Sequence, residues 1–225
     1  MAAQAAGEKG RLILTFEVAL PLGALAFYLY DSALLLHDNE LLFYRRGRHW
    51  DAVSGSDWVI FRRRVCFPAP FMPWSPVLRA FWSSAPPGNT EPTDWPSAQF
   101  MAALRPFQVL CTLLLLLLAV ALPVASLTLG SGFVLLGVFA VYYLLVIAAL
   151  VLLFLRRSRL KLTNRAYWSI AIDTFACAPF AVNLVRRMTL RQTLAADARV
   201  YAESHLPAAA RERLAATVER KREVP

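Results

Sequence analysis

The sequence predicts an all-α integral membrane protein with three transmembrane helices, and a fourth as the alternative. The first observation is a run without any charged side chain from Pro106 to Leu155, bracketed by Arg105 and Arg156. Because a bilayer span needs roughly 20 apolar residues, this run is long enough for two spans and a short turn. The second observation is composition, since 58% of the chain is hydrophobic and only 17% is charged. A soluble protein of 225 residues could not bury so much apolar surface.

The N-terminal segment, residues 1–36, is predicted to contain the first span. Its apolar run extends from Leu12 to Leu36 and is interrupted by Glu17 and Asp31. The run continues past a small-residue stretch that loosely resembles a signal-peptidase site. We therefore interpret this segment as an uncleaved transmembrane helix.

Residues 37–105 are predicted to form an extramembrane region of irregular chain and short strands. Glu40–Tyr44 and Trp58–Phe67 have the composition of strands, and Ser54–Ser56 has the composition of a turn between them. Three arginines interrupt the second run, so its apolar and polar residues do not alternate cleanly.

A proline- and aromatic-rich stretch follows, from Phe67 to Trp82. Its prolines forbid a regular helix, and its aromatic rings, including those of Trp74 and Trp82, favour the membrane–water interface. We expect a loop that lies on the lipid headgroups, with a proline-rich docking site for a partner as the alternative. Residues 85–96 then form a linker rich in Pro, Gly, Asn and Thr.

A transmembrane helical hairpin is predicted over residues 106–155, with its two helices between 107 and 155. The spans are Phe107–Val124 and Phe133–Leu155, joined by a turn at Ser126–Gly132. Pro123 lies near the end of the first span. Glycines in the turn and at the start of the second span would allow close helix packing.

Residues 156–188 are predicted to hold a basic linker and an ambiguous apolar segment. That segment, Ala166–Leu184, is mostly apolar but contains Asp173, Pro179 and Asn183. We interpret it as a re-entrant or interfacial helix, with a fourth transmembrane helix as the alternative.

Residues 189–225 are predicted to form a cytoplasmic amphipathic helical tail. Its apolar positions recur along one face of a helix, and Pro207 breaks that helix. These positions are Leu190, Leu194, Ala198, Val200, Tyr201, Leu206, Leu214 and Val218.

The distribution of positive charge favours three spans, because cytoplasmic segments beside a membrane carry an excess of Lys and Arg. Three spans with the N-terminus outside place the eight Lys/Arg of residues 32–105 and the fourteen of residues 156–225 on the cytoplasmic side, against two outside. Four spans distribute these charges almost evenly. We therefore expect the basic segments to contact anionic lipid, and we expect no nucleic-acid partner.

Three polar residues are candidates for a role inside the membrane: Glu17, Asp173 and Asn183. A charged group in an apolar helix is costly and usually faces protein or a water-filled cavity. Such an acid could relay protons or cations, or it could contact another helix or reach the headgroups. The residues expected to contact lipid headgroups or a partner are Arg62, Arg63, Arg64, Trp74, Trp82, Arg156, Arg157, Arg186 and Arg187.

No catalytic residue, metal ligand or cofactor is predicted. The three cysteines are far apart in the sequence, and the three histidines lack the spacing of a metal site. The sequence also lacks the motifs of phosphate-binding loops and of hydrolase nucleophiles.

These features favour a non-enzymatic multi-pass membrane protein that acts by contact, as an accessory or partner-binding subunit of a membrane complex. Its partners would be the lipid bilayer and another membrane protein or a second copy of itself. The alternatives are a small homo-oligomeric transporter or channel that uses the intramembrane acids, and a membrane enzyme that modifies lipids. Residue usage rich in Ala, Leu and Arg suggests a GC-rich bacterial genome and a cytoplasmic (inner) membrane.

Overall fold

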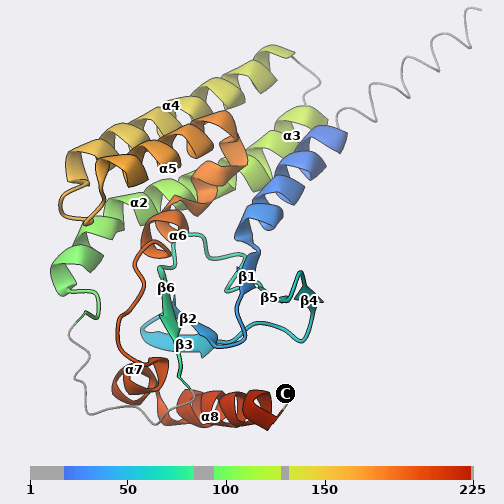
Figure 1. Cartoon of the computed structure of the whole chain (residues 1–225). Helices are drawn as coiled ribbons and strands as arrows, with labels where there is room; N and C mark the ends of the chain where they lie inside the picture. Colours follow the sequence, from blue (N-terminus) through green and yellow to red (C-terminus); the bar gives the residue numbers. More distant parts are fainter. Residues whose placement is uncertain (1–17, 84–93, 128–131, 224–225) are drawn as a thin grey trace, which may run out of the picture. The chain divides into compact units, whose positions relative to one another are not determined.

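The chain is a mixed α/β protein that forms two compact units (Figure 1). This finding corrects the predicted all-α fold class. The structure, a computed structural model, describes residues 18–83, 94–127 and 132–223. Unit 1 comprises residues 1–31 and 106–184, and unit 2 comprises residues 32–105 and 185–225.

Unit 1 is built from apolar helices. The N-terminal helix is described over Val18–Ser32, and the next helix runs without a gap through α2 (Ala98–Leu116), the π-helical segment η1 (Leu117–Ala121) and α3 (Leu122–Leu127). After α4 (Gly132–Arg156), helix α5 (Asn164–Ala176) runs back along α4 and leads into the 3-10 helix η2 (Ala178–Asn183) (Figure 1). The core that joins these elements includes Tyr28, Leu114, Leu118, Tyr142, Val146 and Val182.

Two of the predicted spans correspond to long apolar helices. Among the described residues, 98–127 and 132–156 are long and apolar enough to cross a membrane. The predicted spans at 107–124 and 133–155 are therefore confirmed as helices of sufficient length and composition. Of the turn predicted between them, residues 128–131 lie outside the described part of the chain.

The prediction of three or four transmembrane helices is wrong, because the described chain holds two candidate spans. The first predicted span ends early: its helix stops at Ser32, and Leu34–Leu36 forms strand β1, which pairs with another strand. The ambiguous segment from 166 to 184 is not one helix either. Helix α5 ends at Ala176, and Pro179 stands at the start of η2, where its missing N–H and its ring prevent a continuous α-helix.

Unit 2 contains two antiparallel sheets of three strands each. One sheet has the order β3-β2-β6, with bounds His49–Val53, Glu40–Arg46 and Val77–Phe81. The other has the order β1-β5-β4, with bounds Leu34–Leu36, Arg63–Cys66 and Val59–Ile60. Helices α6 (Leu184–Thr189), α7 (Ala198–His205) and α8 (Ala208–Glu223) complete the fold, and α8 contacts β3.

Strand β2 is central to unit 2 because both of its faces are apolar. Successive side chains of a strand point to opposite faces. Leu41 and Phe43 enter a core with residues of α7 and α8, whereas Leu42 enters a second core with Leu36 and Cys66. A strand that is covered on both faces reads as a continuous apolar run, as Leu41–Phe43 does.

The predicted strand at 40–44 is confirmed as the first part of β2. The strand predicted over 58–67 is instead a hairpin of two short strands, β4 and β5. Strand β6 lies within the stretch that was expected to be a loop on the headgroups, so that expectation is wrong for Val77–Phe81. Most of the predicted linker at 85–96 lies outside the described residues.

The predicted helical tail is confirmed from Ala198 onward, with Pro207 between α7 and α8. Its apolar face covers the β3-β2-β6 sheet of unit 2, because Tyr201, Leu214 and Val218 are buried in the same core as Phe43. Residues 190–197 are not helical.

Replacing Phe43 by Ala should lower the free energy of unfolding by about 3–5 kcal/mol. The Phe43 ring is fully buried and contacts the rings of Trp95 and Tyr201, so its removal leaves a cavity in the core. Chemical denaturation followed by near-UV circular dichroism measures the change. The matched control is Phe71→Ala, because the Phe71 side chain is exposed, and its effect should stay within about 0.5 kcal/mol. Equal effects of the two substitutions would contradict the assigned core.

Candidate functional site

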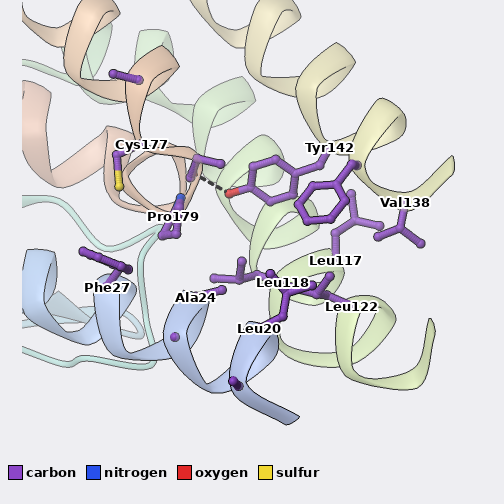
Figure 2. A pocket seen from close by; sticks show the side chains of 15 residues that line it. Leu20, Ala24, Phe27, Leu117, Leu118, Leu122, Val138, Tyr142, Cys177 and Pro179 are labelled. Atoms are coloured by element: carbon purple, nitrogen blue, oxygen red, sulfur yellow. Dashed lines mark hydrogen bonds between the residues drawn. The ribbon is translucent and has the colours of Figure 1, made fainter. Parts of the chain in front are cut away.

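An apolar cleft of about 500 Å³ opens within unit 1 (Figure 2). The N-terminal helix supplies one wall, η1 and α3 supply the second, and α4 and the α5–η2 junction supply the others. The labelled side chains from these elements point into the same space in Figure 2. The lining residues are Ala19, Leu20, Gly23, Ala24, Phe27, Leu117, Leu118, Leu122, Val138, Phe139, Tyr142, Ala176, Cys177, Ala178 and Pro179.

The π-helical segment η1 forms part of the cleft wall, and Pro123 explains why it is there. Proline has no N–H for the carbonyl four residues before it, and its ring clashes with that carbonyl. The chain adjusts just before Pro123: the N–H of Leu122 donates to the carbonyl of Leu117, five residues back. Such π-bulges displace the helix surface locally and are frequent at functional sites.

The break between α5 and η2 forms the opposite wall and is held by Tyr142. A helix interruption leaves backbone carbonyls without helical partners. The hydroxyl of Tyr142 on α4 donates to the carbonyl of Ala178 at 2.7 Å, which is the dashed line in Figure 2. This bond satisfies a carbonyl in an apolar surrounding, where an unpaired one would be costly.

Small residues make the cleft accessible to a bulky apolar group. Ala19, Gly23 and Ala24 line it from the N-terminal helix, and Ala176 and Ala178 line it from the opposite side. A Cβ atom added at Gly23 would meet no heavy atom within 4 Å. The arrangement can therefore hold an apolar chain or helix by packing, and none of the described lining residues is charged.

Two of the three predicted intramembrane residues, Asp173 and Asn183, do not line this cleft. Glu17 lies outside the described residues. Asp173 is exposed on α5, whereas Asn183 is buried in η2. The amide nitrogen of Asn183 donates to the carboxylate of Asp31 at 3.0 Å and lies 3.5 Å from the carbonyl of Tyr28. Asp31 was not identified from the sequence as the partner of Asn183. The signal was present, because Asp31 interrupts the same apolar run as Glu17.

Three of the residues expected at a lipid or partner surface make contacts within unit 2. Trp82 is buried in the core formed with α7 and α8. Arg186 is buried, and its guanidinium donates to the carbonyls of Pro68 and Ala69. Arg64 pairs with Asp38 at 2.8 Å.

The other expected contact residues have open or partly open positions. Arg62 and Arg63 are exposed at the β4–β5 hairpin, and Trp74 and Arg187 are half-buried. Arg156 is half-buried at the end of α4. The guanidinium of Arg157 lies 4.5 Å from the centre of the Phe154 ring and donates to Asn164 at 2.6 Å.

A cluster of aromatic and titratable residues in unit 2 is a second feature that the sequence did not indicate. The Trp95 ring stacks on the His205 ring with a centre-to-centre distance of 3.9 Å, and the hydroxyl of Tyr201 donates to Asp94. Burial, together with the bond to Asp94, raises the pKa of Tyr201 to about 12, and burial lowers the pKa of His205. Both shifts favour neutral rings at neutral pH, which suits packing. Among the described residues, no group of three His, Cys, Asp or Glu side chains could hold a metal ion.

Replacing Tyr142 by Phe should lower the stability of unit 1 by about 0.5–1.5 kcal/mol. The ring that lines the cleft is kept, whereas the bond to the Ala178 carbonyl is lost. Thermal unfolding of the detergent-solubilised protein measures the change. The matched control is Tyr30→Phe, because the Tyr30 side chain is 76% exposed, and its unfolding midpoint should equal that of the parent. A Tyr142→Phe variant as stable as this control would show that the bond contributes nothing.

Acidification below about pH 6.5 should destabilise unit 2 through His205. Because the pKa of His205 is lowered in the folded state, the unfolded chain binds the proton more tightly. The stabilisation is complete above the unfolded pKa and is lost as the pH falls toward the folded pKa. Replacing His205 by Phe keeps the stack on Trp95 and should flatten this part of the pH dependence. Unfolding midpoints measured from neutral to acidic pH test this, with His49→Gln, at an exposed histidine, as the control that should follow the parent.

Comparisons with known proteins do not indicate a function for either unit, so each is interpreted from its own structure. No protein-family model, curated protein or solved structure matches the chain. We take the cleft of unit 1 as the candidate binding site. Its lining is almost entirely apolar, so it is suited to an apolar ligand.

Proposed function

We propose that this protein is a non-enzymatic membrane protein that binds a helix of another membrane protein in the cleft of unit 1, as an accessory subunit of a membrane complex. Membrane residence is supported by the two helices, 98–127 and 132–156, that are long and apolar enough to span a bilayer. The composition of the sequence favours a bacterial cytoplasmic membrane as the location.

The distribution of side chains over unit 1 also supports a lipid environment. Large apolar side chains are exposed along α4 and α5, including Phe133, Leu136, Leu144, Leu155, Ile172 and Phe175. The Asn183 side chain is buried within unit 1, and its amide donates to the carboxylate of Asp31. Lipid solvates exposed apolar side chains, whereas polar groups in a bilayer need partners within the protein.

The observation that carries the proposal is the open, small-residue wall of the cleft. Helices associate in lipid by close packing, because lipid tails are as apolar as the side chains that they contact, and small residues permit that packing. Gly23 faces free space and is flanked by Ala19 and Ala24 in the same wall. The hydroxyl of Tyr142 on α4 is already bonded to Ala178, so an apolar partner does not leave this hydroxyl unsatisfied.

Replacing Gly23 by Leu should reduce recovery of the partner by about tenfold or more, which corresponds to about 1.4 kcal/mol of lost packing. A Cβ atom at this position meets no heavy atom of the chain within 4 Å, and the leucine side chain would occupy space that the partner helix needs. Quantitative co-purification from native membranes in mild detergent measures the change. Gly137→Leu is the matched control, because a Cβ atom there also meets nothing within 4 Å and Gly137 does not line the cleft. Equal recovery with both variants would contradict the proposal.

Photo-crosslinking then identifies what occupies the cleft. Benzoylphenylalanine in place of Phe139, which lines the cleft, should form a crosslink to a second protein in native membranes. The same group in place of Phe133, which is 89% exposed and lies outside the cleft, should label mainly lipid. Crosslinks from position 139 to lipid alone would overturn the proposed occupant, and a crosslink to a second copy of this chain would replace it with a homo-oligomer.

A further inference from the structure

The β4–β5 hairpin in unit 2 exposes a continuous apolar run, from Trp58 beside β4 to Phe61 in the turn at its tip. Phe61 is 91% exposed and Trp58 is 77% exposed, and Val59 and Ile60 between them are also exposed. Four consecutive large apolar side chains in solvent are unusual for a folded domain, since contiguous apolar patches mark interaction sites.

The backbone of this hairpin shows that the exposed tip is a built structure. Phe61 and Arg62 both have positive φ angles, +50° and +61°, as in the two-residue turn that joins tightly paired strands. Asn and Gly normally occupy such positions, because a larger side chain is strained there. The pairing that holds the turn aligns Ile60 with Arg63 and Val59 with Arg64.

The base of the hairpin is held by further bonds. The N–H of Val65 donates to the carbonyl of Trp58 at 3.0 Å, and the hydroxyl of Ser56 donates to the carbonyl of Val65 at 2.7 Å. Gly55 has a φ of +82°, and a Cβ atom there would lie 2.8 Å from the Cβ of Arg64, so the chain needs glycine at this point. The hairpin therefore presents its tip in a defined orientation.

Of the three arginines beside the tip, one is paired with acidic residues and two are exposed to solvent. Arg64 turns back to Asp38 at 2.8 Å and lies 3.9 Å from Asp57. Arg62 and Arg63 are exposed and form no ion pair within the described part of the chain. Because cross-strand neighbours share a face of the sheet, the aliphatic Ile60 and the cationic Arg63 lie side by side.

We propose that this hairpin is an anchor that inserts Trp58 and Phe61 into the interface of an anionic lipid bilayer, with Arg62 and Arg63 on the lipid phosphates. Trp is favoured at the boundary between headgroups and acyl chains. Guanidinium groups bind phosphate through charge-assisted hydrogen bonds and are attracted to anionic lipid. A protein partner could cover the apolar run, but the two exposed cations beside it complement an anionic surface. The inference uses unit 2 alone and does not depend on the cleft.

The test places a polarity-sensitive fluorophore on Phe61→Cys in the full chain, with the three native cysteines replaced by Ala and circular dichroism confirming the fold. The purified protein is reconstituted in vesicles of phosphatidylcholine and phosphatidylglycerol that contain brominated lipid. Quenching at position 61 should be at least about threefold stronger than at the exposed Ala209 of α8, labelled in the same way. Equal quenching at the two positions would overturn the proposal, and it would do so whether or not the cleft binds a partner.

The role of charge is tested by a matched pair of variants. Arg63→Gln should weaken quenching at position 61 in vesicles with phosphatidylglycerol, because an exposed cation is removed. Arg64→Gln removes a cation that is already paired with Asp38 and should leave the quenching unchanged. Equal effects of both substitutions, or the same quenching in vesicles of phosphatidylcholine alone, would rule out recognition of anionic headgroups.

Discussion

Both units depend on one constraint: where proline interrupts the regular backbone, the buried carbonyls left behind must find donors within the protein. In unit 1 the break before Pro179 leaves the Ala178 carbonyl in an apolar setting, and the hydroxyl of Tyr142 satisfies it. In unit 2 the proline-rich loop carries the carbonyls of Pro68 and Ala69, and the buried guanidinium of Arg186 satisfies both. These side chains fix the segments between regular elements, so the wall of the cleft and the packing of the loop follow from them.

The count of 24 Lys and Arg side chains overstates the number of cations that can meet a partner, because several of them are engaged inside the protein. Arg186 serves backbone carbonyls, Arg79 pairs with the fully buried Glu40 at 2.6 Å, and Arg199 pairs with Asp197 at 2.9 Å. Removing Arg79 would leave the buried Glu40 carboxylate uncompensated, which is strongly destabilising. A count of Lys and Arg along the sequence does not distinguish these engaged arginines from exposed ones such as Arg62 and Arg63.

The sequence predicts the parts of the fold whose signal is local. The apolar helices near 107–124 and 133–155, the strand at 40–44 and the break at Pro207 are all recognisable from composition and from single residues. Strand β6 was missed because its five residues follow a proline-rich stretch, and its pairing with β2 is a tertiary contact. The cleft was beyond prediction as well, since its walls come from segments near residues 23, 118, 139 and 177 that meet only in the folded unit. The exposure of Phe61 likewise depends on a turn that its residue types disfavour.

The cleft of unit 1 and the β4–β5 hairpin of unit 2 differ in the forces that would hold a binding partner. None of the described residues that line the cleft is charged, so an occupant would be held there by packing, which salt hardly affects. The hairpin tip combines apolar rings with exposed cations, and attraction between exposed charges is screened over a Debye length of about 8 Å at physiological ionic strength. Binding at the tip would therefore weaken as salt is added, whereas binding in the cleft would persist. The two proposals therefore differ in a measurable way: added salt should weaken attachment of the hairpin to lipid and should leave a partner helix in the cleft.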